Sequence, residues 1–243
     1  TRKYDRRSGK FTVDIAYRTA TEVTPRTIAV SEAFGLGVDQ EQQFVIYDNV
    51  ELKIGPKDIV LITGDSGSGK SVLLKALAKD IKDSPELGDV VNISDVVNVS
   101  AVEDKPLIET VGKSVEEGLE LLSRVGLNDA FLFVRRYREL SDGQRYRYHI
   151  AKMIECGAKW WVMDEFCATL DRDTAKIVAF NVQKLAREAG KAVLAATTHT
   201  DLFQDLVPSV HIHKRFGKEI TVKYHTNDFA PQCTLVKEID VVP

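Results

Sequence analysis

Short apolar runs alternate along the 243-residue chain with segments in which apolar residues recur every three to four positions. The runs at 59–63, 160–163 and 192–197 are almost wholly apolar, which is typical of strands buried on both faces. Helical periodicity marks four segments: 70–79, 114–138 with a break at 126–129, 141–155 and 172–189. This alternation predicts an α/β fold with a mostly parallel sheet flanked by helices.

Other segments alternate between polar and apolar residues, as half-buried antiparallel strands do. Residues 10–17 and 27–30 predict two short strands, 44–54 predicts a strand pair, and 90–99 is rich in β-branched residues. Residues 210–224 alternate around Gly217-Lys218, which indicates a hairpin. We therefore expect an antiparallel β portion beside the parallel sheet.

Composition excludes several classes of protein. The chain has 33 Lys and Arg against 36 Asp and Glu, so its net charge of −3 excludes a strongly basic nucleic-acid coat protein or an acidic disordered chain. No apolar run approaches the roughly 18–20 residues of a membrane span, so we expect no direct membrane insertion. The odd set Cys156, Cys167 and Cys233 favours a reducing cytoplasm over a disulfide framework. The chain begins with Thr1 and not Met, which suggests processing or a cut from a longer protein.

A glycine-rich loop follows the first buried run and opens the first helical segment. Its sequence, GDSGSGKS at 64–71, fits the P-loop pattern, in which backbone N–H groups close around phosphate oxygens at a helix N-terminus. The Lys70 ammonium can reach the β- and γ-phosphates, and the Ser71 hydroxyl suits Mg²⁺. The expected nucleotide-binding residues here are Gly64, Asp65, Ser66, Gly67, Ser68, Gly69, Lys70, Ser71 and Val72.

The buried run at 160–163 ends in two adjacent carboxylates, Asp164 and Glu165. A single acid there would suit a helix cap, but two acids beside a P-loop suit phosphoryl chemistry. Asp164 can hold Mg²⁺ through water, and Glu165 can orient or deprotonate an attacking water. We therefore predict Glu165 as the general base.

Three further polar positions stand at the starts of elements. Ser141 and Gln144 form a predicted capping box, and such a helix start is also an anion site. Asp171 is predicted to cap the next helix. His199 follows the run at 192–197. Taken alone, a histidine in such a loop would not indicate a functional site.

Taken in order, these motifs resemble those of the ABC-type ATPases over residues 28–224. Residues 64–71 match the Walker A loop, 140–144 the family signature, and 162–165 the Walker B strand. Residues 168–171 resemble the D-loop, and His199 the switch histidine. The stretch 48–54 is also similar to the strand that precedes the P-loop in this family.

The resemblance implies a P-loop NTPase fold of ABC type with a short helical subdomain, and ATP and Mg²⁺ as cofactors. It implies an ATP-dependent homodimer packed head to tail, with ATP between Walker A of one copy and Ser141, Gly143 and Gln144 of the other. Asp171 would join the nucleotide site, and His199 would sense the γ-phosphate and act with Glu165 and Lys70. The implied division is a β arm at 1–26, the ATPase domain at 27–224 with its helical subdomain at 104–140, and a tail at 225–243.

The sequence departs from the family pattern at several positions. Asp142 replaces a glycine of the signature, and we expect its carboxylate to point away from the γ-phosphate. The Gln-containing loop is not recognisable; Glu103 is the positional match and a candidate Mg²⁺ ligand. Phe34 is the positional candidate for stacking on adenine, with a core position as its alternative.

Two groups of residues leave alternatives open. The basic, aromatic segments 135–138 and 145–149 predict either a nucleic-acid surface or the usual basic residues after an ABC signature. His211 and His213 share one side of a strand, where a structural role is favoured over a metal site.

The partner of the ATPase also stays open. Phe166 stands where transporter subunits usually carry proline, and the surrounding stretch resembles soluble archaeal-type ABC ATPases often fused to an acetyltransferase-like domain. The main hypothesis is a soluble ABC ATPase acting on nucleic acid or a macromolecular complex. The alternatives are an ATP-binding subunit of a membrane transporter and a nucleotide-gated switch with little turnover.

Overall fold

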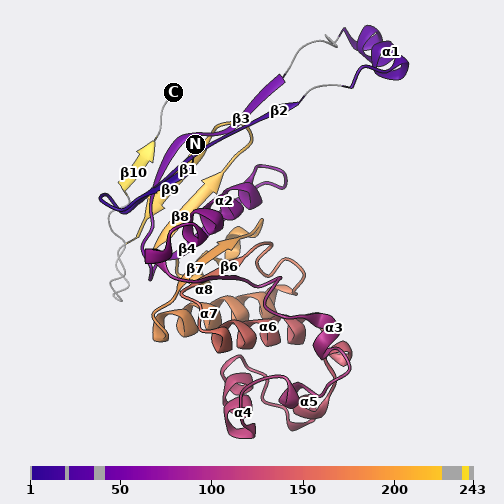
Figure 1. The fold of residues 1–243 in the computed structure, drawn as a ribbon, viewed down its shortest axis with the longest axis vertical. Helices are drawn as coiled ribbons and strands as arrows, with labels where there is room; N and C mark the ends of the chain where they lie inside the picture. The colour runs from indigo at the N-terminus through magenta and orange to yellow at the C-terminus, as the bar shows by residue number, and fades with distance from the viewer. Residues whose placement is uncertain (1, 20–21, 36–41, 226–236, 241–243) are drawn as a thin grey trace.

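The computed structural model of the chain describes residues 2–19, 22–35, 42–225 and 237–240. Figure 1 shows a central sheet with α2 (Lys70–Lys82) on one face and α6 (Asp142–Cys156) and α7 (Arg172–Glu188) on the other. A second, antiparallel sheet from the N-terminal part of the chain lies on the α2 side. The predicted α/β fold is confirmed.

The central sheet has the strand order β10-β9-β8-β4-β7-β6-β5 in the described part of the chain. The parallel strands are β4 (Ile59–Gly64), β5 (Val90–Asn92), β6 (Trp160–Met163), β7 (Ala192–Ala196) and β8 (Val210–Lys214). Because these strands are parallel, their carboxyl ends lie along one edge of the sheet, where the loops that carry chemistry collect.

Two antiparallel strands complete the sheet beyond β8. β9 (Ile220–Tyr224) pairs with β8, which confirms the predicted hairpin, and β10 (Lys237–Asp240) pairs with β9. The predicted tail at 225–243 thus contributes a strand.

The N-terminal sheet consists of β1 (Arg2–Asp5), β2 (Lys10–Thr19) and β3 (Gln42–Lys53). β3 is one long strand, where the sequence predicts a pair. Phe11 and Leu52 are fully buried and share one core cluster with Leu73 of α2. The strands of this N-terminal sheet therefore pack against α2, and the division into a β arm at 1–26 and an ATPase domain from 27 stays a prediction.

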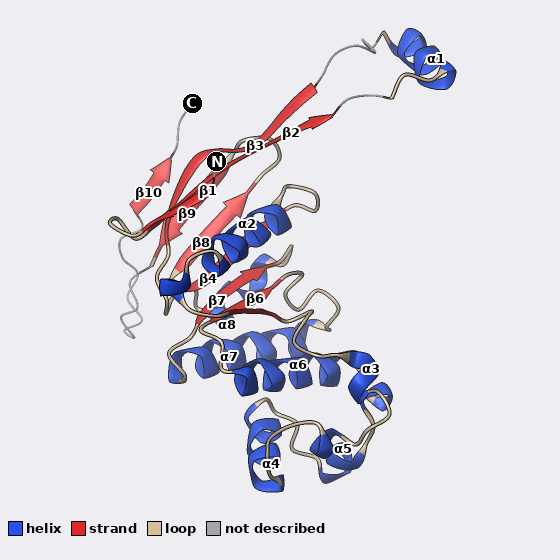
Figure 2. Ribbon diagram, viewed as in Figure 1, coloured by secondary structure: helices blue, strands red, loops and turns tan. Residues whose placement is uncertain are grey.

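A helix, α1 (Pro25–Phe34), stands between β2 and β3 at the tip of an extension (Figure 2). The sequence predicts a strand at 27–30 from its β-branched residues, and that prediction is wrong. The Thr24 hydroxyl accepts a hydrogen bond from the Thr27 N–H, and Pro25 supplies the fixed φ of a first helical residue. Gly35, in a left-handed conformation, ends the helix.

The segment between β5 and α6 forms a small helical region below α6 and α7 (Figure 1). It contains α3 (Val99–Val102), α4 (Val115–Arg124) and α5 (Ala130–Val134). Strand β5 stops at Asn92, so the predicted strand over 90–99 is too long. Short 3₁₀ turns, at Pro85–Leu87, Leu107–Glu109, Tyr137–Glu139 and Thr200–Leu202, and α8 (Phe203–Leu206) complete the connections.

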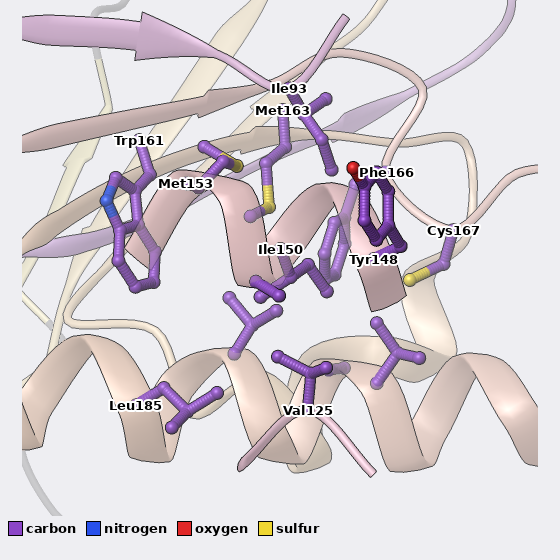
Figure 3. Packing of buried hydrophobic residues seen from close by; sticks show 14 of the residues in the cluster. Ile93, Val125, Tyr148, Ile150, Met153, Trp161, Met163, Phe166, Cys167 and Leu185 are labelled. Atoms are coloured by element: carbon purple, nitrogen blue, oxygen red, sulfur yellow. The ribbon is translucent and has the colours of Figure 1, made fainter. Parts of the chain in front are cut away.

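A second core cluster joins α6 and α7 to the sheet. Figure 3 shows Ile150 and Met153 of α6 packed among Trp161 and Met163 of β6 and Leu185 of α7. These side chains are almost completely buried, and each such burial contributes roughly 1.5–3 kcal/mol of transfer free energy. The packing fixes the start of α6 relative to the carboxyl end of β6.

Candidate functional site

The glycine-rich loop connects β4 to α2 and depends on left-handed backbone conformations. Gly67 and Gly69 have φ angles of 76° and 103°. A Cβ atom at Gly69 would lie 2.7 Å from the Ile46 Cγ2 atom of β3, so only glycine fits. The loop therefore holds its N–H groups near the start of α2, as phosphate binding requires.

Lys70 is folded back across this loop. Its Nζ donates hydrogen bonds to the carbonyl oxygens of Gly64 at 2.8 Å and Asp65 at 2.6 Å. Burial lowers the pKa of Lys70, while the charges of Asp65 and Asp164 act in the opposite direction. The ammonium is thus held at the mouth of the loop by weak neutral acceptors, which anionic oxygens can replace.

Ser71 and Asp164 meet beside the loop. The Ser71 hydroxyl donates to Asp164 Oδ1 at 2.8 Å, and the Glu165 N–H donates to the same oxygen at 3.1 Å. A hydroxyl and a carboxylate side by side fit a Mg²⁺ ion, which prefers oxygen ligands. Within the described residues, the buried Ser68 hydroxyl has no hydrogen-bond partner, so this cradle holds an unsatisfied donor for an anion.

The loops after β6 and β7 lie next to each other because these strands pair, with Met163 opposite Ala195. The Phe166 N–H donates to the Ala196 carbonyl at 2.7 Å and ties the two loops together. Glu165 has a left-handed φ of 50°, and the His199 N–H donates to Thr197 Oγ1 at 3.1 Å. The structure thus places the predicted base and the predicted switch histidine in adjacent loops.

The capping predictions are confirmed. Ser141 Oγ accepts from the Gln144 N–H at 3.3 Å, and Gln144 Oε1 accepts from the Ser141 N–H at 3.0 Å. Asp171 Oδ1 accepts from the Thr174 N–H at 2.9 Å, which caps α7. Asp142 turns its carboxylate toward Arg145, with Oδ1 3.5 Å from NH1.

Ser141, Gly143 and Gln144 are not joined to the P-loop of their own chain. No hydrogen bond between described residues links them to residues 64–72. The capped start of α6 is therefore exposed, with its cap hydrogen bonds made within the helix itself.

Glu103 does not join the Ser71–Asp164 pair. It ends α3, its side chain is exposed, and its carbonyl accepts from the Arg138 N–H at 3.2 Å. β5 pairs with β6 only as far as Asn92 opposite Val162, and the chain turns immediately after Asn92. No hydrogen bond between described residues joins Glu103 to Ser71 or Asp164, and its assignment as a Mg²⁺ ligand stays a prediction.

Phe34 is also placed elsewhere, because it ends α1 at the tip of the extension (Figure 1). Tyr17 and Phe44 lie opposite each other on β2 and β3 and are 48% and 53% exposed. They continue the strand face of Ile15 and Tyr47, and the Tyr47 hydroxyl donates to the Gly69 carbonyl at 2.9 Å. Sequence reasoning missed this aromatic pair, because it forms only across the long β2–β3 register.

The basic, aromatic segments are used largely within the chain. Arg145 NH2 donates to the Arg138 carbonyl at 2.9 Å, and Arg147 NH1 donates to the Gly126 carbonyl at 3.2 Å. The rings of Tyr137 and Tyr148 are buried. Two of the arginines and two of the rings in these segments therefore make contacts within the chain, while Arg135 and Arg136 are exposed.

His211 and His213 both contact one hydroxyl. Their ring nitrogens lie 2.8 and 2.9 Å from Thr63 Oγ1, just before the P-loop. Burial, with the charges of neighbouring basic groups, lowers the pKa of His211 to about 4. The described residues contain no group of three His, Cys, Asp or Glu side chains suited to a metal.

None of the described helices has the length and apolarity needed to cross a membrane. The model of the ABC transporter family matches residues 47–168. A cytochrome c biogenesis ATP-binding export protein of Gluconobacter oxydans is 28% identical over 169 residues, covering 65% of this chain and 76% of the relative. A lipoprotein-releasing system ATP-binding protein of Ehrlichia ruminantium is 31% identical over 202 residues, covering 70% and 85%.

The fold is similar to that of a solved ATP-binding cassette, a dimer in a post-hydrolysis state bound to ADP and Pi. The TM-score is 0.54 at 22% sequence identity, covering 74% of this chain and 92% of the cassette. ABC ATP-binding domains of this family bind and hydrolyse ATP. With its P-loop, paired carboxylates and capped signature helix, the chain belongs to the ABC transporter ATP-binding family and is an ABC-type ATPase.

Proposed function

We propose that two copies of this chain close head to tail on ATP, hydrolyse it between them, and open again. The observation that carries this proposal is the convergence of Lys70, Ser71 and Asp164 on one loop, with the signature helix start left free for a second copy. The dimeric state of the solved cassette with ADP and Pi supports it.

The residues have distinct roles in this proposal. The N–H groups of residues 64–72 bind phosphate, and Lys70 exchanges its two carbonyl acceptors for phosphate oxygens. When bound, Mg²⁺ would be held by Ser71 and Asp164 and would offset phosphate charge. Glu165 orients the attacking water and takes its proton.

The remaining site residues complete the closed state. His199 senses the γ-phosphate from the loop beside Glu165. Ser141, Gly143 and Gln144 of the second copy offer a helix N-terminus to that same phosphate, and Asp171 holds the next helix start beside them. The exposed pair Tyr17 and Phe44 supplies a stacking surface for the base, the role for which the sequence indicates Phe34.

We further propose that the cycle drives a membrane transporter partner. Two relatives are ATP-binding proteins of an export and a lipoprotein-releasing system. Arg145 and Arg147 donate hydrogen bonds to carbonyl groups of their own chain, which argues against nucleic acid as the partner. A fused acetyltransferase-like domain, a separate macromolecular complex and a cytoplasmic location stay predictions.

Lys70→Ala tests nucleotide binding. It should abolish binding of a fluorescent ATP analogue, because the loop loses its one cation at the phosphates. Lys75→Ala, an exposed lysine on the same helix, is the matched control and should bind normally. Tight binding by Lys70→Ala would contradict the P-loop assignment.

ATPase assays with added DNA and RNA test the partner. The transporter proposal expects steady turnover that neither nucleic acid changes. Stimulation that falls steeply with salt would favour nucleic acid instead. Binding without measurable turnover would favour the nucleotide-gated switch.

A further inference from the structure

The tip of the β8–β9 hairpin carries an exposed aromatic ring next to the P-loop. Phe216 is 64% exposed. A Cβ atom placed on Gly67 would lie 3.8 Å from its Cε1 atom, so the ring stands against the loop. Singly exposed apolar side chains are common on protein surfaces, so it is the position of this ring against the phosphate-binding loop that makes it a candidate contact.

This hairpin tip is held in one position. The Lys214 ammonium is buried and donates to the Arg215 carbonyl at 2.6 Å and to the Gly217 carbonyl, which fixes the turn. The same ammonium lies 5.4 Å from the centre of the Tyr47 ring, whose hydroxyl bonds to Gly69 of the P-loop. A pre-organised ring loses little conformational entropy on binding.

A pocket of complementary character lies at the start of the signature helix. Its volume is about 330 Å³, near the lower end of ligand pockets at roughly 300–1,000 Å³. Its lining combines three rings, a cation, an acid, an aliphatic side chain and two hydroxyls: Tyr137, Tyr146, His149, Arg145, Asp142, Ile93, Ser94 and Thr169. Such a site suits an aromatic side chain, which can stack on the rings and accept the Arg145 cation on its face.

Exposed charges of opposite sign stand at the two places, and each has a partner in its own chain: Glu219 and Asp48 at the hairpin tip, and Arg145 at the pocket. The hairpin tip exposes Arg215 and Lys218, whose side chains are 62% and 60% accessible. At the pocket, Asp142 is 72% accessible and stands where the family signature has a glycine. Arg215 and Lys218 each form an ion pair within their own chain. Their attraction to Asp142 of the other copy therefore orients the contact and adds little to its affinity.

We infer that Phe216 of one copy inserts into this pocket of the second copy when the dimer closes. The inference rests on the proposed head-to-tail dimer, which sets the P-loop of one copy against the signature of the other. Phe216 lies beside the P-loop and the pocket lies beside the signature. Closure of the dimer therefore brings the ring and the pocket together at both of its nucleotide sites. Asp142 then faces the basic hairpin tip of the other copy.

Dimerisation measurements test the inference. In the Glu165→Gln background, ATP-driven dimerisation is measured by size exclusion with light scattering. Phe216→Ala removes the contact on both sides of the dimer and should weaken dimerisation by about 10- to 100-fold, while binding of a fluorescent ATP analogue to the monomer is unchanged. Phe216→Trp should retain the dimer. Phe131→Ala, an exposed phenylalanine on α5, is the matched control and should have no effect.

Cross-linking locates the contact directly. With Cys156 and Cys233 replaced by serine, copies carrying Phe216→Cys are mixed with copies carrying Thr169→Cys. When a mild chemical oxidant is added to take up the two electrons, a disulfide between unlike copies is expected with ATP and not without it. Full dimerisation of the Phe216→Ala variant would overturn the inference about Phe216 but not the proposed dimer. The same holds if the parent protein dimerises and no ATP-dependent disulfide forms. A parent that fails to dimerise would overturn the proposed head-to-tail dimer itself.

Discussion

The Ser71 hydroxyl donates a 2.8 Å hydrogen bond to the Asp164 carboxylate, across 93 residues of sequence. The bond joins the first turn of α2 to the residue that follows β6. These two elements are far apart in sequence and are brought together by the central sheet. Because the two oxygens are already together, a Mg²⁺ ion needs little rearrangement to reach both. The packing of the central sheet therefore determines the position of the proposed Mg²⁺ site.

Ser71→Ala should reduce Mg²⁺-dependent ATP hydrolysis by about 10- to 100-fold or more, because the proposed metal ligand is lost. Folding should be little affected, since the carboxylate left behind remains open to water. Steady-state ATPase assays over a Mg²⁺ titration measure the change. Ser123→Ala, an exposed serine on α4, is the control; equal activity of the two variants would remove Ser71 from the site.

Gly69→Ala should abolish ATP binding. An added Cβ would meet Ile46 Cγ2 at 2.7 Å in a backbone conformation with φ of 103°, so the loop must move. Calorimetric titration with ATP measures the loss. Normal affinity would show that the loop tolerates a side chain and that its glycine geometry is not required.

Gly157→Ala is the matched control for that experiment. Gly157 also has a positive φ, of 73°, but no atom lies within 4 Å of an added Cβ. The expected cost is about 1–2 kcal/mol of unfolding free energy from backbone strain alone, with ATP affinity unchanged. The comparison separates strain from steric conflict with β3.

His211 should make stability depend on pH. Burial lowers its pKa from 6.5 to about 4 in the folded chain. Between those values the unfolded state binds more protons, so stability is complete above pH 6.5 and falls as the pH drops toward 4. Because the ring is only half-buried, the loss should be about 1–2 kcal/mol. Urea unfolding of wild type and His211→Gln across this range checks it: the variant should have a shallower slope, and equal slopes would contradict the assignment.

Much of the site could be predicted from the sequence because its residues are fixed locally. The P-loop glycines, the acids that end β6 and the Ser141–Gln144 capping box each depend on residues a few positions apart. Local chemistry also explains α1, since Thr24 and Pro25 are a helix-start signal. There the β-branched residues at 27–30 misled the prediction, and the cap decided the structure.

Other features depend on pairing between distant strands. Strand β5 is only three residues long because it pairs with β6 only as far as Asn92, whereas the β-branched residues continue to Val99, so the sequence overestimates its length. Tyr17 faces Phe44 only in the β2–β3 register, which contains bulges near Ile15. Such contacts are set by the whole sheet, and no local pattern encodes them.

The measurement that tests the account most directly compares Glu165→Gln with wild type in two readings, ATP turnover and oligomeric state. Glutamine keeps the shape but cannot take a proton, so turnover should fall by about 10²- to 10⁴-fold. ATP should then hold the variant as a stable dimer, seen by light scattering, that wild type forms only transiently. Unchanged turnover together with a monomer in ATP would contradict both the assigned base and the head-to-tail site.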